Sequence, residues 1–239
     1  MDFFDNLISQ VEELTALPNR SDYFRKNGSV WKDAGRNEVV LLRDTAFELG
    51  GSDLSAVGCN LVTSNSIGDS GVTVIGNDLC DLEKDCAFAR ISLIEIDDIA
   101  DEQEAYNAIR KIEYVKYHIF PEGYMMRTSS ESLREQVRVS KKAIKQGISF
   151  EKIGNALIDR YLENRLVRAV RIIFITDKSA DYSRLYRIAL KNNEITKALN
   201  HALNHVNFDC NSCNLKPICD EVEGMKELHF KNAGMQNIL

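Results

Sequence analysis

The stretch "VRAVRIIFIT", residues 167–176, predicts a buried strand more clearly than any other segment, because β-branched residues and a phenylalanine dominate it. A helix is expected before it, over residues 150–163. Helical spacing of apolar residues returns after it in "SADYSRLYRIAL" (179–190) and "EITKALNHAL" (194–203). This part of the chain therefore alternates between helix and strand.

Two further elements are expected upstream of this alternation. The segment "GYMMRTS", residues 123–129, predicts a strand, and a helix is expected over residues 131–146 with Gly147 as its stop signal. Pro121 comes just before the strand and closes an earlier helix, which begins near Asp101 and repeats apolar residues with a helical period. Pro121 is therefore the natural boundary between the two halves of the chain.

The region before this helix favours strands. Short runs rich in valine, isoleucine and phenylalanine are separated by glycine, asparagine, aspartate and serine. These runs cover residues 39–50, 55–63, 72–76 and 87–97. We predict an α+β fold in which a strand-rich lobe (35–120) lies beside a βααβα lobe (121–205). An N-terminal helix and connection (1–34) come first, and a cysteine-rich metal-binding segment (206–239) comes last.

Composition narrows the classes of function. The net charge of −6 over 239 residues argues against a general attraction to nucleic acid. Residues 1–14, "MDFFDNLISQVEEL", place acids where a secretory signal carries basic residues, and no segment is apolar for long enough to span a membrane. We expect a cytoplasmic protein without a nucleic-acid or membrane partner. Because disulfides do not persist in a reducing cytoplasm, clustered cysteines indicate metal binding or redox chemistry.

The segment "FDCNSCNLKPICDEVEG", residues 208–224, holds three of the six cysteines. Cys210 and Cys213 form a Cys-x2-Cys pair, whose thiolates can reach one metal ion or two irons of a cluster. Cys219 follows after five residues and can fold back to the same centre, helped by the stiffness of Pro217. Crowded thiolates repel one another unless a cation neutralises them. The three cysteines therefore predict a metal centre.

Three interpretations of this centre stay open: an iron-sulfur cluster, a zinc site with His229 as fourth ligand, and plain thiols without metal. No fourth cysteine follows locally. Cys59, Cys80 and Cys86 have suitable chemistry, but each lies beside a strand-like apolar run, so packing in the core is the favoured role for all three. A vacant fourth position would leave one iron open to a substrate, a small ligand or a partner's group.

Charged residues suggest further sites. On the expected 131–146 helix the four cations Arg134, Arg138, Lys141 and Lys145 share one face. We favour a solvated surface for this stripe; the functional alternative is a cofactor-binding anion site for a CoA-like phosphate, a corrinoid tail or an acidic redox partner.

Two other polar patterns have simpler interpretations. Residues 78–104 contain ten carboxylates against Lys84 and Arg90, which favours a solvated surface. His201 and His205 are four residues apart on an expected helix, without the glutamate of the zinc-protease sequence between them. We expect this histidine pair to be structural.

The stretch "RVSKKAIKQGISFEKIGNALIDRYLENRLVRAVRIIFITD", residues 138–177, resembles the central domain of acetyl-CoA synthase. That protein is the nickel and iron-sulfur subunit of the carbon monoxide dehydrogenase/acetyl-CoA synthase complex. The segment "TAFELGG" (45–51) and the strands around "VTVIG" resemble the first part of the same domain, so the resemblance covers residues 35–219. In the family a cysteine segment then supplies four thiolates to a [4Fe-4S] cluster. The resemblance implies Cys210, Cys213 and Cys219 as cluster ligands.

This sequence also departs from the family pattern. The spacing to Cys219 is shorter, no fourth cysteine follows it, and the Cys-Gly-Cys element that holds the family's nickel pair is absent. The family's large N-terminal region and catalytic C-terminal domain are also missing from the resemblance. We therefore do not expect the chain to carry out the acetyl-forming reaction by itself.

Three classes of function follow. The leading expectation is an iron-sulfur accessory or electron-transfer protein of anaerobic one-carbon or corrinoid metabolism, with a redox or corrinoid protein as partner. The second is an enzyme whose open-site cluster acts on a CoA-linked or methyl-corrinoid substrate. The third is a zinc-stabilised protein-interaction module. The oligomeric state stays open.

Overall fold

The computed structural model describes residues 3–25, 30–51, 53–99, 101–129, 133–203 and 213–222, together with residues 225 and 228. Over these residues it contains two β-sheets and six α-helices, which confirms the predicted α+β class. The helices are α1 (Asp5–Leu14), α2 (Glu102–Val115), α3 (Lys141–Lys145), α4 (Phe150–Leu162), α5 (Tyr182–Leu203) and α6 (Lys216–Glu221). The strands are β1 (Arg20–Phe24), β2 (Thr45–Leu49), β3 (Ala56–Thr63), β4 (Gly71–Ile75), β5 (Phe88–Ile96), β6 (Tyr124–Thr128), β7 (Glu135–Ser140) and β8 (Val167–Ile175).

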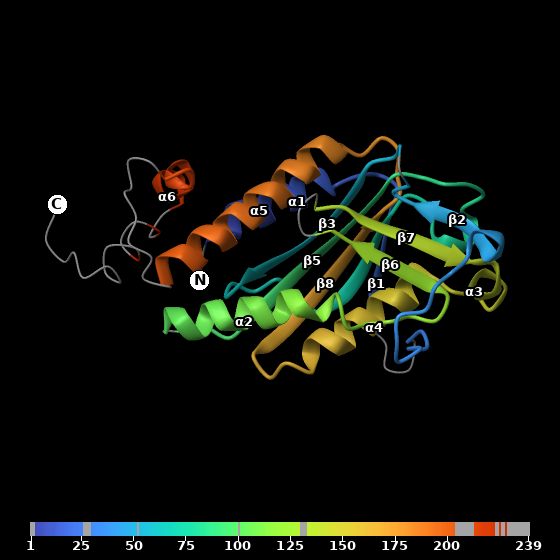
Figure 1. The fold of residues 1–239 in the computed structure, drawn as a ribbon, viewed down its shortest axis with the longest axis horizontal. Helices are drawn as coiled ribbons and strands as arrows, with labels where there is room; N and C mark the ends of the chain where they lie inside the picture. Colours follow the sequence, from blue (N-terminus) through green and yellow to red (C-terminus); the bar gives the residue numbers. More distant parts are fainter. Residues whose placement is uncertain are drawn as a thin grey trace, which may run out of the picture.

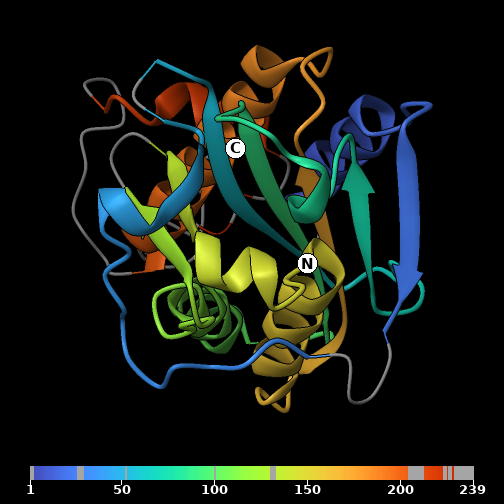
Figure 2. The ribbon, with the colours of Figure 1, turned by 90° about the vertical axis from the view of Figure 1, so that its right-hand side faces the viewer.

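The larger sheet has the strand order β1-β4-β8-β5-β3 (Figure 1). β8, the strand predicted first from the sequence, lies between β4, to which it is parallel, and β5, to which it is antiparallel. α4 packs on one face of this sheet, and α1 and α5 cover the other (Figure 2). Because helices cover both faces, the interior strands are apolar throughout rather than alternating.

Close packing of α4 on the sheet depends on a glycine in the helix. An added Cβ at Gly154 would lie 2.4 Å from Cγ2 of Val72 on β4 and 3.2 Å from the ring of Phe174 on β8. Glycine normally weakens a helix interior, so its presence here is explained by the close approach of helix and sheet.

The smaller sheet has the order β2-β7-β6, with both pairs antiparallel. It lies at the β3 side of the larger sheet, away from β1 (Figure 2). Each sheet contains strands from both sides of residue 120. In the larger sheet, β8 lies with β3, β4 and β5, which come earlier in the chain, and in the smaller sheet β2 pairs with β7. The domain boundaries at residues 34, 120 and 205 stay predictions.

The expectation of one helix over residues 131–146 is wrong. Residues 135–140 form β7, and only residues 141–145 form the short helix α3. The sequence "EQVRVS" alternates, with Glu135, Val137 and Val139 buried on one side, and it pairs with two strands. Ser140 then caps α3 by accepting a hydrogen bond from the Ala143 amide. Tertiary pairing therefore overrides the helical spacing of the cations.

Smaller differences concern where helices begin and end. The helix expected up to Phe120 ends at Val115, and the helical segments expected over 179–190 and 194–203 belong to one helix, α5. β1 was not expected, because its sequence "RSDYF" is polar and its side chains are mostly exposed. Within the described ranges, no helix combines the length and the apolar character that crossing a bilayer requires.

Candidate functional site

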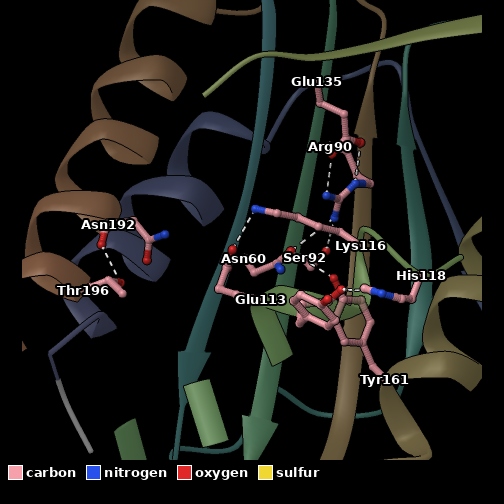
Figure 3. Close-up of polar contacts among 11 residues, drawn as sticks. Asn60, Arg90, Ser92, Glu113, Lys116, His118, Glu135, Tyr161, Asn192 and Thr196 are labelled. Carbon is pink, nitrogen blue, oxygen red and sulfur yellow. Dashed lines mark hydrogen bonds and ion pairs between the residues drawn. The ribbon is translucent and has the colours of Figure 1, made fainter. Parts of the chain in front are cut away.

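An ion pair is completely buried between the two sheets. The guanidinium of Arg90 on β5 donates through Nε and Nη2 to the two carboxylate oxygens of Glu135 on β7, each at 2.6 Å (Figure 3). Both side chains are 0% exposed. Burial works against the charged guanidinium, but the adjacent carboxylate outweighs it, so the pKa of Arg90 is raised above its usual value. The pair therefore stays charged and joins the two sheets.

Neutral polar groups complete this buried network. Nη1 of Arg90 donates to Oδ1 of Asn60 at 3.2 Å and to Oγ of Ser92 at 2.5 Å, and the Tyr161 hydroxyl also donates to Asn60 Oδ1. Among the described residues, the Asn60 amide nitrogen and the Tyr124 hydroxyl have no hydrogen-bond partner. Burial, and then the charge of Glu135, raises the pKa of Tyr124 well above 10. The network therefore keeps the charges of Arg90 and Glu135 at fixed positions in the core, beside the cavities described below.

Gly58 on β3 makes room for this ion pair. A Cβ added there would lie 2.7 Å from the Glu135 Cβ and 2.8 Å from its Oε2. Any larger residue would have to move the carboxylate away from Arg90. The close approach of β3 to β7 thus explains a glycine within an otherwise apolar strand.

A second ion pair lies at the end of α2. Nζ of Lys116 is 2.7 Å from Oε2 of Glu113, and the lysine side chain is 10% exposed against 28% for the glutamate. Burial lowers the pKa of Lys116, but the charge and hydrogen bond of Glu113 more than offset it, and the net pKa is raised above 10.5. Lys116 is therefore a nearly buried ammonium at neutral pH.

A cleft of about 460 Å³ opens beside this lysine, and we call it the outer cleft. Its wall contains three cationic side chains against one carboxylate, a net charge of +2, together with aromatic and methionine side chains. The lining residues are Asn37, Glu38, Lys116, Tyr117, Ile119, Phe120, Pro121, Tyr124, Met125, Met126, Arg127, Thr128, Ser129, Arg134 and Gln136. Arg127 is exposed and has no ion-pair partner among the described residues. Such a surface suits an anionic ligand with an apolar portion.

A smaller cavity of about 100 Å³, the inner pocket, lies between α2, α5 and β3, the edge strand of the larger sheet. Its lining residues are Gly58, Cys59, Glu113, Lys116, Tyr117, Thr128, Ser129, Leu133, Ala189, Asn192, Asn193 and Thr196. Four of them, Lys116, Tyr117, Thr128 and Ser129, also line the outer cleft. The two cavities therefore share the wall formed by the end of α2 and the end of β6, and together they form the candidate site.

The four predicted cofactor-binding cations do not form one stripe. Nη2 of Arg134 donates to the carbonyls of residues 50, 51 and 54, and its side chain lines the outer cleft. Arg138, on β7, donates to Glu48 of β2 and to the Val40 carbonyl. Arg134 is therefore placed at the candidate site, whereas the contacts of Arg138 are structural.

Lys141 and Lys145 lie on α3, away from the inner pocket. Both are exposed and line a third cavity, of about 680 Å³, that also contains Lys142. Nζ of Lys141 donates to the Arg43 carbonyl, and Lys142 pairs with Glu122. Three carboxylates also line this cavity, so its charge is balanced rather than strongly cationic.

The described cysteines are dispersed. Cys59 is buried and lines the inner pocket, and burial raises the pKa of its thiol to about 12. Cys80 is exposed, so the expectation that it packs in the core is wrong, and Cys86 is half-buried. Cys213 and Cys219 are half-buried; Cys213 precedes α6, and Cys219 lies within it. Cys210, His205 and His229 lie outside the described residues. Within the part of the chain that the structure describes, no three metal-ligating side chains come together.

Comparison with known proteins gives the lineage of this fold. Residues 34–180, more than half of the chain, match the model of the family described as CO dehydrogenase/acetyl-CoA synthase complex beta subunit. The chain belongs to this family. None of the curated proteins compared with it matches. The family match includes Arg90, Lys116 and Glu135, whereas the α5 wall of the inner pocket and the cysteine segment lie beyond it.

Within this acetyl-CoA synthase family member, sequence reasoning missed three largely buried charges, Arg90, Glu135 and Lys116. Arg90 was grouped with a solvated acidic surface, which is wrong, because it is completely buried. A signal was available, because Arg90 is the one charged residue in "FARISLI" (88–94), the apolar run that makes up most of β5. Lys116 and Glu135 gave no such signal, since their neighbours in sequence are mixed.

Proposed function

We propose that this protein is an iron-sulfur accessory or electron-transfer component of a carbon monoxide dehydrogenase/acetyl-CoA synthase complex, in anaerobic one-carbon or corrinoid metabolism. One observation carries the proposal: the chain belongs to the family of a subunit of that complex, and a Cys-x2-Cys segment with a third cysteine follows the matched residues. Thiolates in this arrangement are the usual ligands of iron-sulfur clusters. The acetyl-forming reaction is not part of the proposal.

The cysteine side chains of this segment are of the chemical type that binds an iron-sulfur cluster. Cys213 and Cys219 are soft ligands, and both pack half-buried against the core beside Leu215 and Ile218, which gives a cluster partial shelter from solvent. Pro217 lies in the first turn of α6, where its missing amide proton costs nothing. Cys210, Cys213 and Cys219 would hold the cluster, and a bound cluster would supply one-electron transfer.

Anaerobic purification tests this function directly. We expect brown protein with several irons and matching acid-labile sulfide per chain, and an absorbance near about 400 nm that falls on reduction. The measurement is iron, sulfide and zinc analysis together with the spectrum before and after dithionite. Colourless protein with one zinc per chain would instead support a zinc-stabilised interaction module, and protein without either metal would contradict both.

A second candidate function is an enzyme acting on a CoA-linked or methyl-corrinoid substrate, and the outer cleft favours it. The cleft's net charge of +2 and its Tyr117, Met125 and Met126 side chains suit a ligand with phosphate groups and an apolar arm. Arg127 and Arg134 supply the guanidinium groups that phosphates prefer.

Binding of CoA to the purified protein checks this candidate. Because a charge-assisted hydrogen bond contributes about 1.5–3 kcal/mol, Arg127→Gln should weaken CoA binding roughly tenfold or more in a titration calorimeter. Arg168→Gln is the matched control, since that arginine is exposed and pairs with Asp97 outside the cleft. Equal losses of CoA affinity in the two variants would mean that CoA binding depends only on the overall charge of the protein.

A further inference from the structure

The inner pocket offers more hydrogen-bond donors than the protein itself uses. Asn192 on α5 is 8% exposed, and its side-chain amide has no hydrogen-bond partner among the described residues. Its neighbour Thr196 donates to the Asn192 backbone carbonyl and not to the side-chain amide, and Asn192 lines the cavity. Figure 3 shows the Asn192 amide and the Lys116 ammonium directed toward one another from α5 and α2. Because these amide atoms can be reached from the cavity, water or a bound group in the pocket can take up their hydrogen bonds.

Lys116 adds a positive charge on the opposite side of the pocket. An ammonium has three protons, and Glu113 takes the one that has an acceptor within the described residues. Glu113 is more exposed than Lys116, 28% against 10%, so solvent screens its charge more than that of the lysine. The wall of the pocket therefore holds one ammonium paired with one carboxylate, and it still offers unused donor protons on Lys116 and Asn192.

The volume limits what can enter. A cavity of about 100 Å³ holds a few water molecules or one small organic group, and it has no room for a nucleotide or a long chain. A small, oxygen-rich group meets both requirements, because it fits the volume and accepts hydrogen bonds from Asn192 and Lys116. A neutral apolar molecule would leave the amide and the ammonium protons unsatisfied.

We propose that the inner pocket is a binding site for a small carboxylate of about three or four carbon and oxygen atoms, held between the Lys116 ammonium and the Asn192 amide. Formate and acetate are the simplest molecules of this class. The site does not depend on the cysteine segment. Binding can therefore be tested on full-length protein whatever its metal content, and failure of the iron-sulfur proposal would leave it intact.

A series of carboxylates of increasing length tests the proposal without any mutation. Titration of the full chain, followed by ¹H–¹⁵N spectra at constant ionic strength with chloride as the reference salt, should show saturable shifts for formate and acetate. Hexanoate should bind at least tenfold more weakly, because the cavity cannot contain it. Equal binding of all three carboxylates, or spectral shifts that chloride reproduces, would overturn the proposal. A cavity that holds only water would give no saturation by formate and acetate at about 50-fold the protein concentration and above, and that result would also overturn it.

Variants then locate the bound molecule. Asn192→Ala should weaken acetate binding at least fivefold, and Lys116→Gln at least tenfold, because each removes one donor to the carboxylate. Asn107→Ala is the matched control, since Asn107 is exposed on α2 and does not line the pocket. Saturable acetate binding that is unchanged in folded Asn192→Ala protein would place the carboxylate elsewhere and overturn the assignment.

Discussion

Arg90→Met should lower the free energy of unfolding by about 3–5 kcal/mol, because it leaves the Glu135 carboxylate buried without its partner. Two hydrogen bonds at 2.6 Å and the contacts to Asn60 and Ser92 are lost together. Since the pair joins β5 to β7, we also expect the contact between the two sheets to loosen. Urea unfolding followed by circular dichroism measures the change.

Two comparisons make this result specific to the buried pair. Arg168→Met removes an arginine that is 62% exposed and pairs with Asp97 on the surface, so it should cost about 1 kcal/mol or less. The double variant Arg90→Met with Glu135→Leu should recover part of the loss, because no unpaired charge remains in the core. If the single variant Arg90→Met were as stable as Arg168→Met, the pair would not join the sheets as described.

Cys210→Ser and Cys213→Ser should each remove most of the bound iron, because they destroy the Cys-x2-Cys pair that is proposed to hold the cluster. Cys219→Ser should do nearly the same, since two thiolates alone cannot retain a cluster. The rest of the fold should survive, because both sheets form their core upstream of residue 206. Iron and sulfide analysis after anaerobic purification measures the loss, and circular dichroism checks the fold.

The upstream cysteines are the internal controls for this series. Cys80→Ser should leave iron and stability unchanged because Cys80 is exposed, whereas Cys59→Ser should lower stability modestly because that side chain is 3% exposed in the core. Full iron content in the Cys210 and Cys213 variants would rule out the cluster at this segment. Iron lost in one of the Cys59, Cys80 and Cys86 variants would identify the fourth ligand.

Elements with a strong local pattern were predictable from the sequence. β8, α4 and α1 are close to their predicted positions, because an apolar run or a clear helical period determines each of them. Residues 135–140 were not, since the spacing of their charges fits a helix while the buried Glu135, Val137 and Val139 fit a strand. Pairing with β2 and β6 decides between the two patterns, and that pairing is not a local property of the sequence.

The candidate site was less accessible to sequence reasoning than the fold. The inner pocket combines Cys59, Lys116 and Asn192 from three elements that are far apart in the chain. No motif spacing connects them, and neither the lysine nor the asparagine differs in its local surroundings from an ordinary surface residue. The family, in contrast, was recognisable, because it follows from a continuous stretch of similar sequence.

The central place of β8 also bears on how the protein is made. With the order β1-β4-β8-β5-β3, removing β8 would leave two separate pairs, β1 with β4 and β5 with β3. A nascent chain that has emerged from the ribosome only as far as residue 160 therefore cannot complete the larger sheet, although it already carries four of its five strands. Closure must wait for contacts between β4 and β8, which are about a hundred residues apart, and such distant pairings make folding slow and expose strand edges meanwhile. This protein is thus expected to need protection from aggregation until late in its synthesis.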